Sequence, residues 1–109
     1  MIQTKAYHAH VYYRIADKEA ARVLCEGASE KFGVRMGRMH DGPVGPHPVG
    51  SCQLSVPARK MDDLVAWLDD NRGELTVLLH SLTGDELRDH TEGVGWLGEP
   101  MALDISIFQ

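Results

Sequence analysis

Apolar and polar residues alternate strictly near the start of the chain, in the stretch YHAHVYYRI at residues 7–15. Such alternation predicts a β-strand with one face toward a core, because successive strand side chains point to opposite faces. The predicted core face carries Tyr7, Ala9, Val11, Tyr13 and Ile15. The opposite face carries His8, His10, Tyr12 and Arg14. Two imidazoles therefore point the same way from one short strand.

Two segments show the helical spacing of apolar residues. The first helix is predicted from an N-cap at Asp17 to about Phe32, and Gly33 ends it. Its apolar stripe consists of Ala20, Leu24, Ala28 and Phe32, with Val23 beside it. The second helix is predicted from about Ala58 to Arg72 and is followed by Gly73. Its stripe consists of Met61, Leu64, Val65 and Leu68.

Four further stretches are predicted as strands, at residues 34–40, 51–57, 74–80 and 101–107. The loop at 41–50 contains three prolines and three glycines, so it cannot continue a strand ladder and should be stiff. In the strand at 74–80, the inward set is Leu75, Val77 and Leu79, which leaves Thr76, Leu78 and His80 outward. The polar stretch from Ser81 to Pro100 predicts a turn and a short helix.

The element order is β-α-β-β-α-β, which predicts an α+β, ferredoxin-like sandwich with a C-terminal helical turn and an extra strand. Both long helices should cover one face of an antiparallel sheet and leave the other face open. We expect the first and third strands to be parallel central neighbours, with the fourth strand antiparallel beside the first. The whole chain, residues 1–109, is expected to form one domain.

Composition and charge exclude several functions. The formal net charge is −5 and no stretch concentrates Lys and Arg, so we expect no nucleic-acid partner. No apolar run approaches the roughly 20 residues that span a bilayer, so we expect no membrane partner. The N-terminus MIQTKAYH lacks the apolar core of a secretory signal, and Cys25 and Cys52 read as reduced thiols in or near the core. These features together predict a cytoplasmic protein.

The predicted topology gathers all six histidines toward one end of the sheet. His8 and His10 begin the first strand, and His80 ends the strand that lies beside it. The faces agree as well, so these three imidazoles should converge on the open side. Neutral imidazoles suit a first-row metal such as Fe, Zn, Cu or Ni, and we therefore predict a metal site at His8, His10 and His80.

Other side chains are candidates for catalysis and substrate binding. His47 is held between Pro46 and Pro48, either as a loop histidine on the surface or over the cleft as a fourth ligand or an acid–base group. His90 follows Asp89, which could orient its ring. The candidate substrate contacts are Tyr12, Arg38 and Trp96, beside the charged residues Arg35, Asp85 and Glu86.

Four segments, YHAHVYY, GPVGPHP, LTVLLHSLTGDELRDHT and WLGEP, resemble the DOPA 4,5-dioxygenase family in order and spacing. The resemblance runs from Tyr7 to about Leu103, and the block from His80 to Trp96 is its most specific part. Two positions depart from the family pattern. Ser81 stands where we expect proline, and Gly93-Val94 stands where we expect a bulkier pair.

The resemblance implies a ferredoxin-like fold, non-haem Fe(II) and extradiol cleavage of a catechol such as DOPA by O₂. It carries His8, His10, His47, His80 and His90 over as site candidates. An all-histidine site would also accept Zn(II), which cannot support this redox chemistry. Many non-haem Fe(II) oxygenases add one carboxylate ligand, for which Asp41 and Asp89 are the candidates here.

Two other functions stay open at this point. One is a non-catalytic metal- or ligand-binding domain, and the other is a cofactor-free monooxygenase of the dimeric ferredoxin-like type. The convergence of five or more histidines disfavours the second. A homodimer is expected in each case, because the open sheet face of so small a domain invites a partner.

Overall fold

The structure, a computed structural model, describes residues 5–109. Two predictions, the single domain over residues 1–109 and the absence of a secretory signal, fall partly on residues 1–4. Those four residues lie outside the described residues. The strands are β1 Ala6–Tyr13, β2 Arg35–Met36, β3 Gly50–Pro57, β4 Thr76–Ser81 and β5 Val94–Leu97. The α-helices are α1 Lys18–Phe32, α2 Ala58–Asn71 and α3 Glu86–Asp89, and 3-10 helices cover Ile15–Asp17 and Ser106–Phe108.

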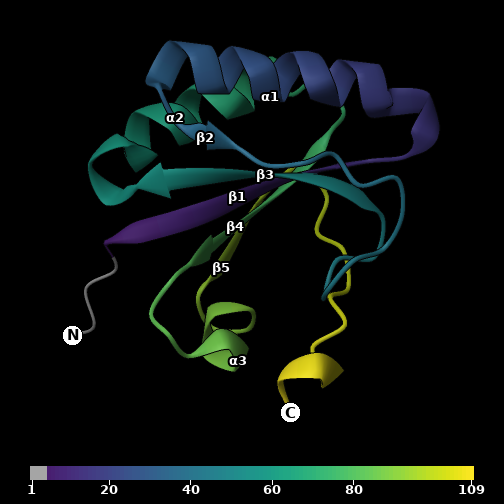
Figure 1. The fold of residues 1–109 in the computed structure, drawn as a ribbon, viewed down its shortest axis with the longest axis vertical. Helices are drawn as coiled ribbons and strands as arrows, with labels where there is room; N and C mark the ends of the chain where they lie inside the picture. Colours follow the sequence, from purple (N-terminus) through teal and green to yellow (C-terminus); the bar gives the residue numbers. More distant parts are fainter. Residues whose placement is uncertain (1–4) are drawn as a thin grey trace.

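Two layers make up the molecule. Within residues 5–109 the five strands form one sheet in the order β2-β3-β1-β4-β5, and each pair of neighbours is antiparallel. Helices α1 and α2 cover one face, while α3, the loop at 41–49 and the C-terminal segment lie on the other side (Figure 1). The predicted ferredoxin-like α+β fold, with a helical turn and an extra strand, is confirmed. Among the described helices, none has both the length and the apolar character needed to cross a bilayer.

The direction of β3 corrects one prediction. We expected β1 and β3 to be parallel, but they pair antiparallel, with Ala6 opposite Pro57 and Tyr13 opposite Gly50. The reason is the chain path, since β3 turns back from β2 and enters between β2 and β1. The start of β3 therefore lies beside the end of β1, so strand position alone does not bring His47 to the start of β1.

Two predicted strands also differ. The strand at 34–40 is reduced to Arg35–Met36 plus one bridge from His40 to Ser51. The fifth strand is Val94–Leu97, which pairs with β4, and residues 101–105 are irregular. Apolar and polar residues alternate along 101–105, as they would in a strand. Its backbone hydrogen bond to another described segment is the one that Asp104 N donates to Pro46 O, at 2.9 Å. One hydrogen bond to a loop does not make a strand ladder.

The inner face of β1 packs as predicted, with Ala9, Val11 and Tyr13 in the core. The stripe of α1 is rotated from the prediction, since its buried residues are Ala21, Leu24, Cys25 and Ala28. Val23 is 60% exposed, and Ala20 is exposed as well. Ile15 is 65% exposed because the strand ends at Tyr13 and a 3-10 turn follows. Both cysteines are free and buried, as expected.

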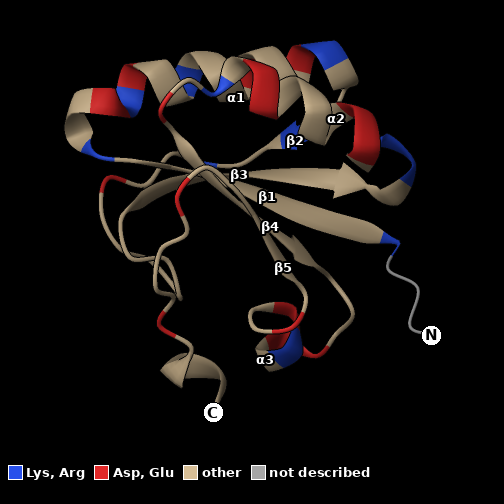
Figure 2. Ribbon diagram, turned by 180° about the vertical axis from the view of Figure 1, so that it is seen from behind, with Lys and Arg blue, Asp and Glu red and all other residues tan. Residues whose placement is uncertain are grey.

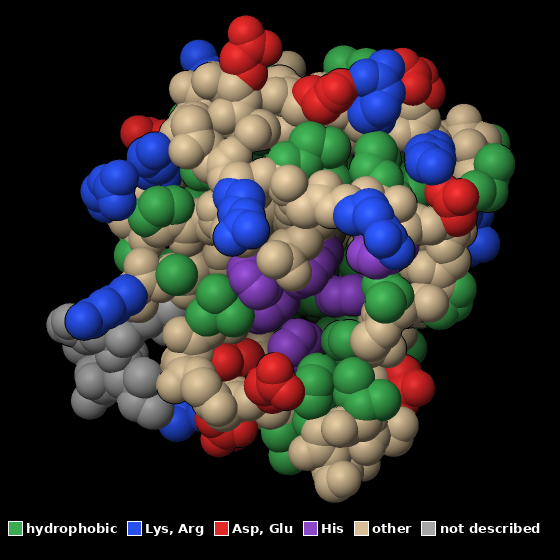
Figure 3. All heavy atoms as spheres, in the orientation of Figure 1, with side chains coloured by type: hydrophobic (Ala, Val, Ile, Leu, Met, Phe, Trp, Pro, Cys, Tyr) green, Lys and Arg blue, Asp and Glu red, His purple; other side chains and the backbone are tan. Residues whose placement is uncertain are grey.

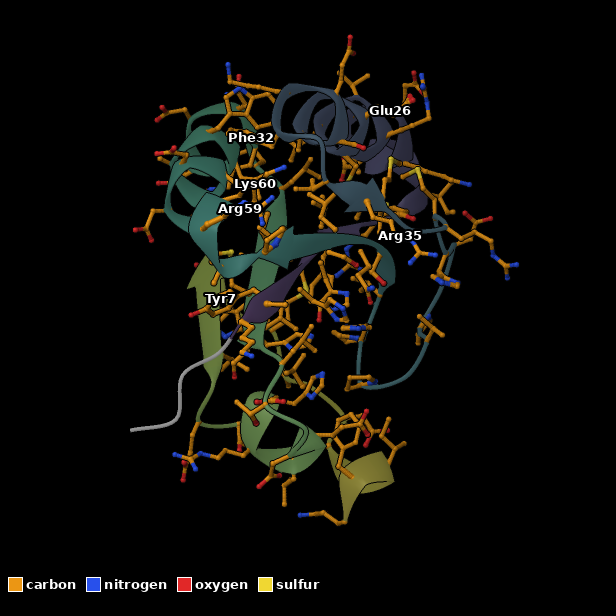
Figure 4. All side chains as sticks on the ribbon, turned by 60° about the vertical axis from the view of Figure 1, so that its left-hand side comes forward. Tyr7, Glu26, Phe32, Arg35, Arg59 and Lys60 are labelled. Carbon is orange, nitrogen blue, oxygen red and sulfur yellow. The ribbon has the colours of Figure 1, made fainter. Side chains whose placement is uncertain are left out.

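Helix α1 ends as its sequence predicts, and a side chain from α2 supports that end. Gly33 adopts φ 63°, a left-handed conformation that glycine adopts without strain. The ammonium of Lys60 donates to the carbonyl of Phe32 at 2.7 Å and so joins α2 to the last turn of α1 (Figure 4). Asp17 occupies the predicted N-cap position of α1, although its side chain makes no capping hydrogen bond.

Charged residues lie mainly on the helices and loops, and the sheet strands carry few of them (Figure 2). The open face of the sheet is therefore free for a site built from neutral groups.

The corrected helix stripe makes a prediction about two adjacent residues. Leu24→Ala removes a buried side chain from under α1 and should cost about 2–4 kcal/mol of unfolding free energy. Val23→Ala removes an exposed side chain and should change the free energy by less than about 0.5 kcal/mol. Urea denaturation of both variants measures the difference. Equal destabilisation would contradict the placement of the stripe.

Candidate functional site

Three histidines from β1 and β4 converge on the open face of the sheet. The register sets His8 directly opposite His80, and His10 follows two residues later on the same face. One ring nitrogen from each of His8, His10 and His80 lies within 4.8 Å of the others. The structure thus brings together the three residues predicted to hold a metal, while their role as ligands stays a prediction.

Hydrogen bonds fix the tautomer of His80. Its Nδ1 lies 2.8 Å from the carbonyl of Ser81, which can only accept, so Nδ1 carries the proton. Nε2 therefore presents a lone pair, and His10 Nε2 donates to it at 2.9 Å. A backbone carbonyl that orients a ligand imidazole is a common support in metal sites. The donor set fits a first-row metal, which would take the place of the proton shared between the two Nε2 atoms.

Burial keeps this cluster uncharged. Desolvation, followed by the neighbouring imidazoles, lowers the pKa of His10 well below its ordinary value. Desolvation is also the main cause that lowers the pKa of His80 to about 4 and that lowers the pKa of His8. The imidazoles are therefore neutral near pH 7, and neutral imidazole is the form that binds a metal.

The loop at 41–49 brings His47 across the open face. His47 is buried and its Nδ1 lies 2.7 Å from the hydroxyl of Tyr12. The centroid of its ring is 4.1 Å from that of His10. The amide of His47 also donates to Val44 O at 3.0 Å, so the stiff loop folds back on itself. His47 thus reaches the cluster through its loop.

His90 approaches the cluster from α3. The centroid of its ring lies 4.2 Å from that of His80 and 4.5 Å from that of Phe108, on which it stacks. Its Nδ1 donates to the carbonyl of Glu86 at 2.7 Å. Asp89 does not orient this ring, contrary to expectation, because Glu86 O already holds it.

The two candidate carboxylate ligands are used elsewhere. Asp89 is buried and accepts hydrogen bonds from the Ser81 hydroxyl and from the amide and hydroxyl of Thr83. Burial by itself raises the pKa of Asp89, but these hydrogen bonds outweigh burial and hold the pKa below its ordinary value. Asp41 pairs with Lys18 at 2.6 Å on the surface. Within residues 5–109, the metal-binding cluster consists of histidines alone.

A cavity of about 400 Å³ opens over the histidines. Its wall includes His8, His10, His47, His80 and His90, with Phe108, Ile107, Leu82, Gln53 and Glu86. Figure 3 shows the histidines in a hollow, with Lys and Arg side chains above it and Asp and Glu side chains below. His40 pairs with Ser51, far from the start of β1, which corrects the expectation that all six histidines share one end. It lines a smaller cavity beside His10 and His47.

None of the three predicted substrate contacts, Tyr12, Arg38 and Trp96, lines this cavity. Tyr12 is 1% exposed, and its hydroxyl is engaged by His47. Trp96, on β5, lies opposite Leu78 of β4, and its ring centroid is 6.0 Å from that of Tyr12. Neither Trp96 nor Tyr12 lines the cavity. Arg38 is exposed after β2 and does not line it either. Arg35 on β2 instead shares a cross-strand row with His8, through Ser55.

Several wall residues escaped the sequence analysis. Gln53 lies directly opposite His10 in β3, so strict alternation along that strand would have found it. No pattern in the sequence pointed to Phe108 and Ile107 as cavity residues. An irregular segment sets their position, and the alternation of apolar residues there resembles that of a strand.

The two departures from the family pattern lie in contact. The amide of Ser81 donates to Gly93 O at 3.1 Å, a bond that a proline could not make. A Cβ on Gly93 would approach the Ser81 hydroxyl oxygen to 2.3 Å, so a larger residue does not fit beside Ser81. The two positions therefore form one local packing solution at the end of β4.

Comparisons with known proteins agree with this geometry. A sequence model described as the Dopa 4,5-dioxygenase family matches residues 7–107. A protein of Amanita muscaria described as DOPA 4,5-dioxygenase is 34% identical over 115 residues, which cover 95% of this chain and 50% of the relative. A 21.2 kDa protein of Botryotinia fuckeliana described as uncharacterized is 34% identical over 114 residues, which cover 94% of this chain and 62% of that protein. The chain thus spans only 50% and 62% of these two relatives.

A solved structure is also similar. A crystal structure from Nostoc punctiforme, provisionally described as a dioxygenase, superposes with a TM-score of 0.90 at 40% sequence identity. The match covers 94% of this chain and 89% of that one. The similarity therefore extends over nearly the whole fold.

The histidine cluster predicts metal binding that depends on three residues. Titration of the metal-free protein with Co(II), followed by absorbance, should show one site. Single changes of His8, His10 or His80 to Ala should each weaken binding by more than the ~10–100-fold typical of losing an outer-shell partner. His40→Ala is the matched control and should bind normally. Normal binding by His10→Ala and His80→Ala would contradict the site.

Burial of neutral histidines predicts a pH-dependent stability. The folded pKa values of His47 and His80 are about 4, below the ordinary 6.5, so the unfolded chain binds more protons between these values. The metal-free protein should therefore keep its stability above about pH 6.5 and lose it toward pH 4, by at least ~2 kcal/mol. Urea unfolding in chelator measures this. His80→Gln should show a shallower dependence, and an unchanged dependence would refute the cause.

Proposed function

This chain belongs to the Dopa 4,5-dioxygenase family, and we propose that it is a dioxygenase that opens the ring of a catechol by extradiol cleavage. The observation that carries the proposal is the convergence of His8, His10 and His80 at one cavity. We propose Fe(II) as the active metal, with these three imidazoles as its ligands, and Zn(II) as an inactive occupant of the same site. When bound, Fe(II) would supply the coordination of the catechol oxygens and the activation of O₂.

Two further imidazoles are suited to proton transfer at the substrate. His90 donates through Nδ1 to Glu86 O, which leaves its Nε2 as an acceptor. We assign His90 as the base that takes a catechol proton. His47 lies against His10 on the other side of the cluster. We assign it to proton transfer at the reacting oxygens. Both atoms of O₂ end in the ring-opened product, a muconate semialdehyde.

The size and charge of the cavity favour a catechol with a charged side chain. A volume of about 400 Å³ exceeds that of a bare catechol ring. Phe108 and Ile107 offer apolar walls for the ring, and Glu86 offers a carboxylate that suits an ammonium group. Arg35 does not line the cavity, but it lies in the cross-strand row of His8 on the same face of the sheet and suits a carboxylate. DOPA carries both groups and is our first candidate substrate.

The homodimer and the cytoplasmic location stay predictions.

Reconstitution with Fe(II) under anaerobic conditions tests the proposal. Admission of O₂ with DOPA, caffeate, protocatechuate or catechol should give O₂ uptake and a yellow ring-opened product, with DOPA the fastest. A chelator should abolish both signals, and His10→Ala should lose activity while His40→Ala keeps it. Metal binding without O₂ uptake on any catechol would favour a non-catalytic metal-binding domain. Activity that survives removal of the metal would favour a cofactor-free monooxygenase.

A further inference from the structure

The contact between Tyr12 and His47 has an unusual setting. Tyr12 lies on the open face of the sheet and is 1% exposed, and His47 is 8% exposed. The oxygen of Tyr12 and Nδ1 of His47 are 2.7 Å apart. Among residues 5–109, the Tyr12 hydroxyl makes its hydrogen bond with His47. The neighbouring Tyr13 hydroxyl instead donates to His40 O and Ser51 O.

Accounting for hydrogens decides which group donates. A tyrosine phenol is protonated at neutral pH, so Tyr12 keeps its proton. If Nδ1 of His47 donated, the buried phenol hydrogen would have no recorded acceptor, and an unsatisfied buried donor costs about 1–3 kcal/mol. No buried side-chain nitrogen or oxygen among the described residues lacks a partner. The phenol therefore donates, and Nδ1 accepts.

We propose that Tyr12 is a positioning residue that fixes the tautomer of His47, so that Nε2 of His47 carries the proton and faces the histidine cavity. A neutral imidazole has one N–H, so an accepting Nδ1 requires a protonated Nε2. This nitrogen has no recorded partner and is not a buried unsatisfied atom, so it is open to one of the two neighbouring cavities that His47 lines. The inference rests on the proposed function for its catalytic meaning, but the tautomer itself does not.

The tautomer separates two roles for His47 that the sequence left open. The lone pair of His47 is on Nδ1 and is used by Tyr12, so His47 is a hydrogen-bond donor to a reacting oxygen and not a fourth ligand. His10 differs, because no hydrogen bond among the described residues holds its Nδ1, and its proton can move there when a metal binds Nε2. His47 and His90 then differ in a defined way, since Nε2 donates in His47 and accepts in His90.

Nitrogen NMR of the metal-free wild-type protein tests the tautomer without any activity. Long-range ¹H–¹⁵N spectra of the imidazoles should show His47 with a protonated Nε2 and an unprotonated Nδ1, assigned by loss of the signals in His47→Gln. A protonated Nδ1 in His47 would overturn the proposal. The proposed function could fail with this result intact, so the two failures are distinguishable.

Removal of the Tyr12 hydroxyl tests positioning. In Tyr12→Phe the His47 signals should move toward a mixture of tautomers, while Tyr13→Phe, which also removes a buried hydroxyl, should leave them unchanged. In the Fe(II) enzyme, Tyr12→Phe should lower kcat by about tenfold or more with little change in KM, and Co(II) affinity should stay normal. An unchanged tautomer in a folded Tyr12→Phe, or an unchanged kcat, would overturn the proposal. If Tyr12→Phe does not fold, the wild-type spectrum decides.

Discussion

The hydrogen-bonded register between β1 and β4 places His8 directly opposite His80, and the rest of the site follows from it. Strand alternation sends Ala9 and Val11 into the core beneath the helices, and so it sends His8 and His10 to the open face. A slip of one residue would bury the imidazoles among apolar side chains and expose the core residues. The packing that stabilises the fold and the placement of the metal-binding groups are therefore one constraint.

The open face stays competent because its imidazoles are neutral and its buried carboxylate is paired. Desolvation lowers the pKa values of His47 and His80, and each ring nitrogen with a known partner has a defined role. Asp89 is the buried carboxylate of this region, and it is satisfied by Ser81 and Thr83. It holds the turn that carries His90 toward His80 and leaves the histidines free to bind a metal.

The sequence predicted what depends on periodicity and failed where long-range pairing decides. Alternation in β1 and β4 was sufficient for His8, His10 and His80, because faces follow directly from spacing. The direction of β3 follows from the chain path, since β3 turns back from β2 and enters beside β1. The phase of α1 depends on packing that hydropathy does not encode, since Cys25 and Ala21 look no more buried than Ala20. His47 and His90 were candidates from the residues around them, and the family resemblance carried both over as site residues. Phe108 was missed because an irregular tail positions it against His90.

One measurement tests the central claim most directly. Crystals soaked anaerobically with Fe(II) and measured at the iron absorption edge should show one strong anomalous peak within bonding distance of His8, His10 and Nε2 of His80. His47 should remain bonded to Tyr12 and outside the coordination sphere. A peak at another position, or iron bound without His10 and His80, would contradict the claim that these histidines form the metal centre.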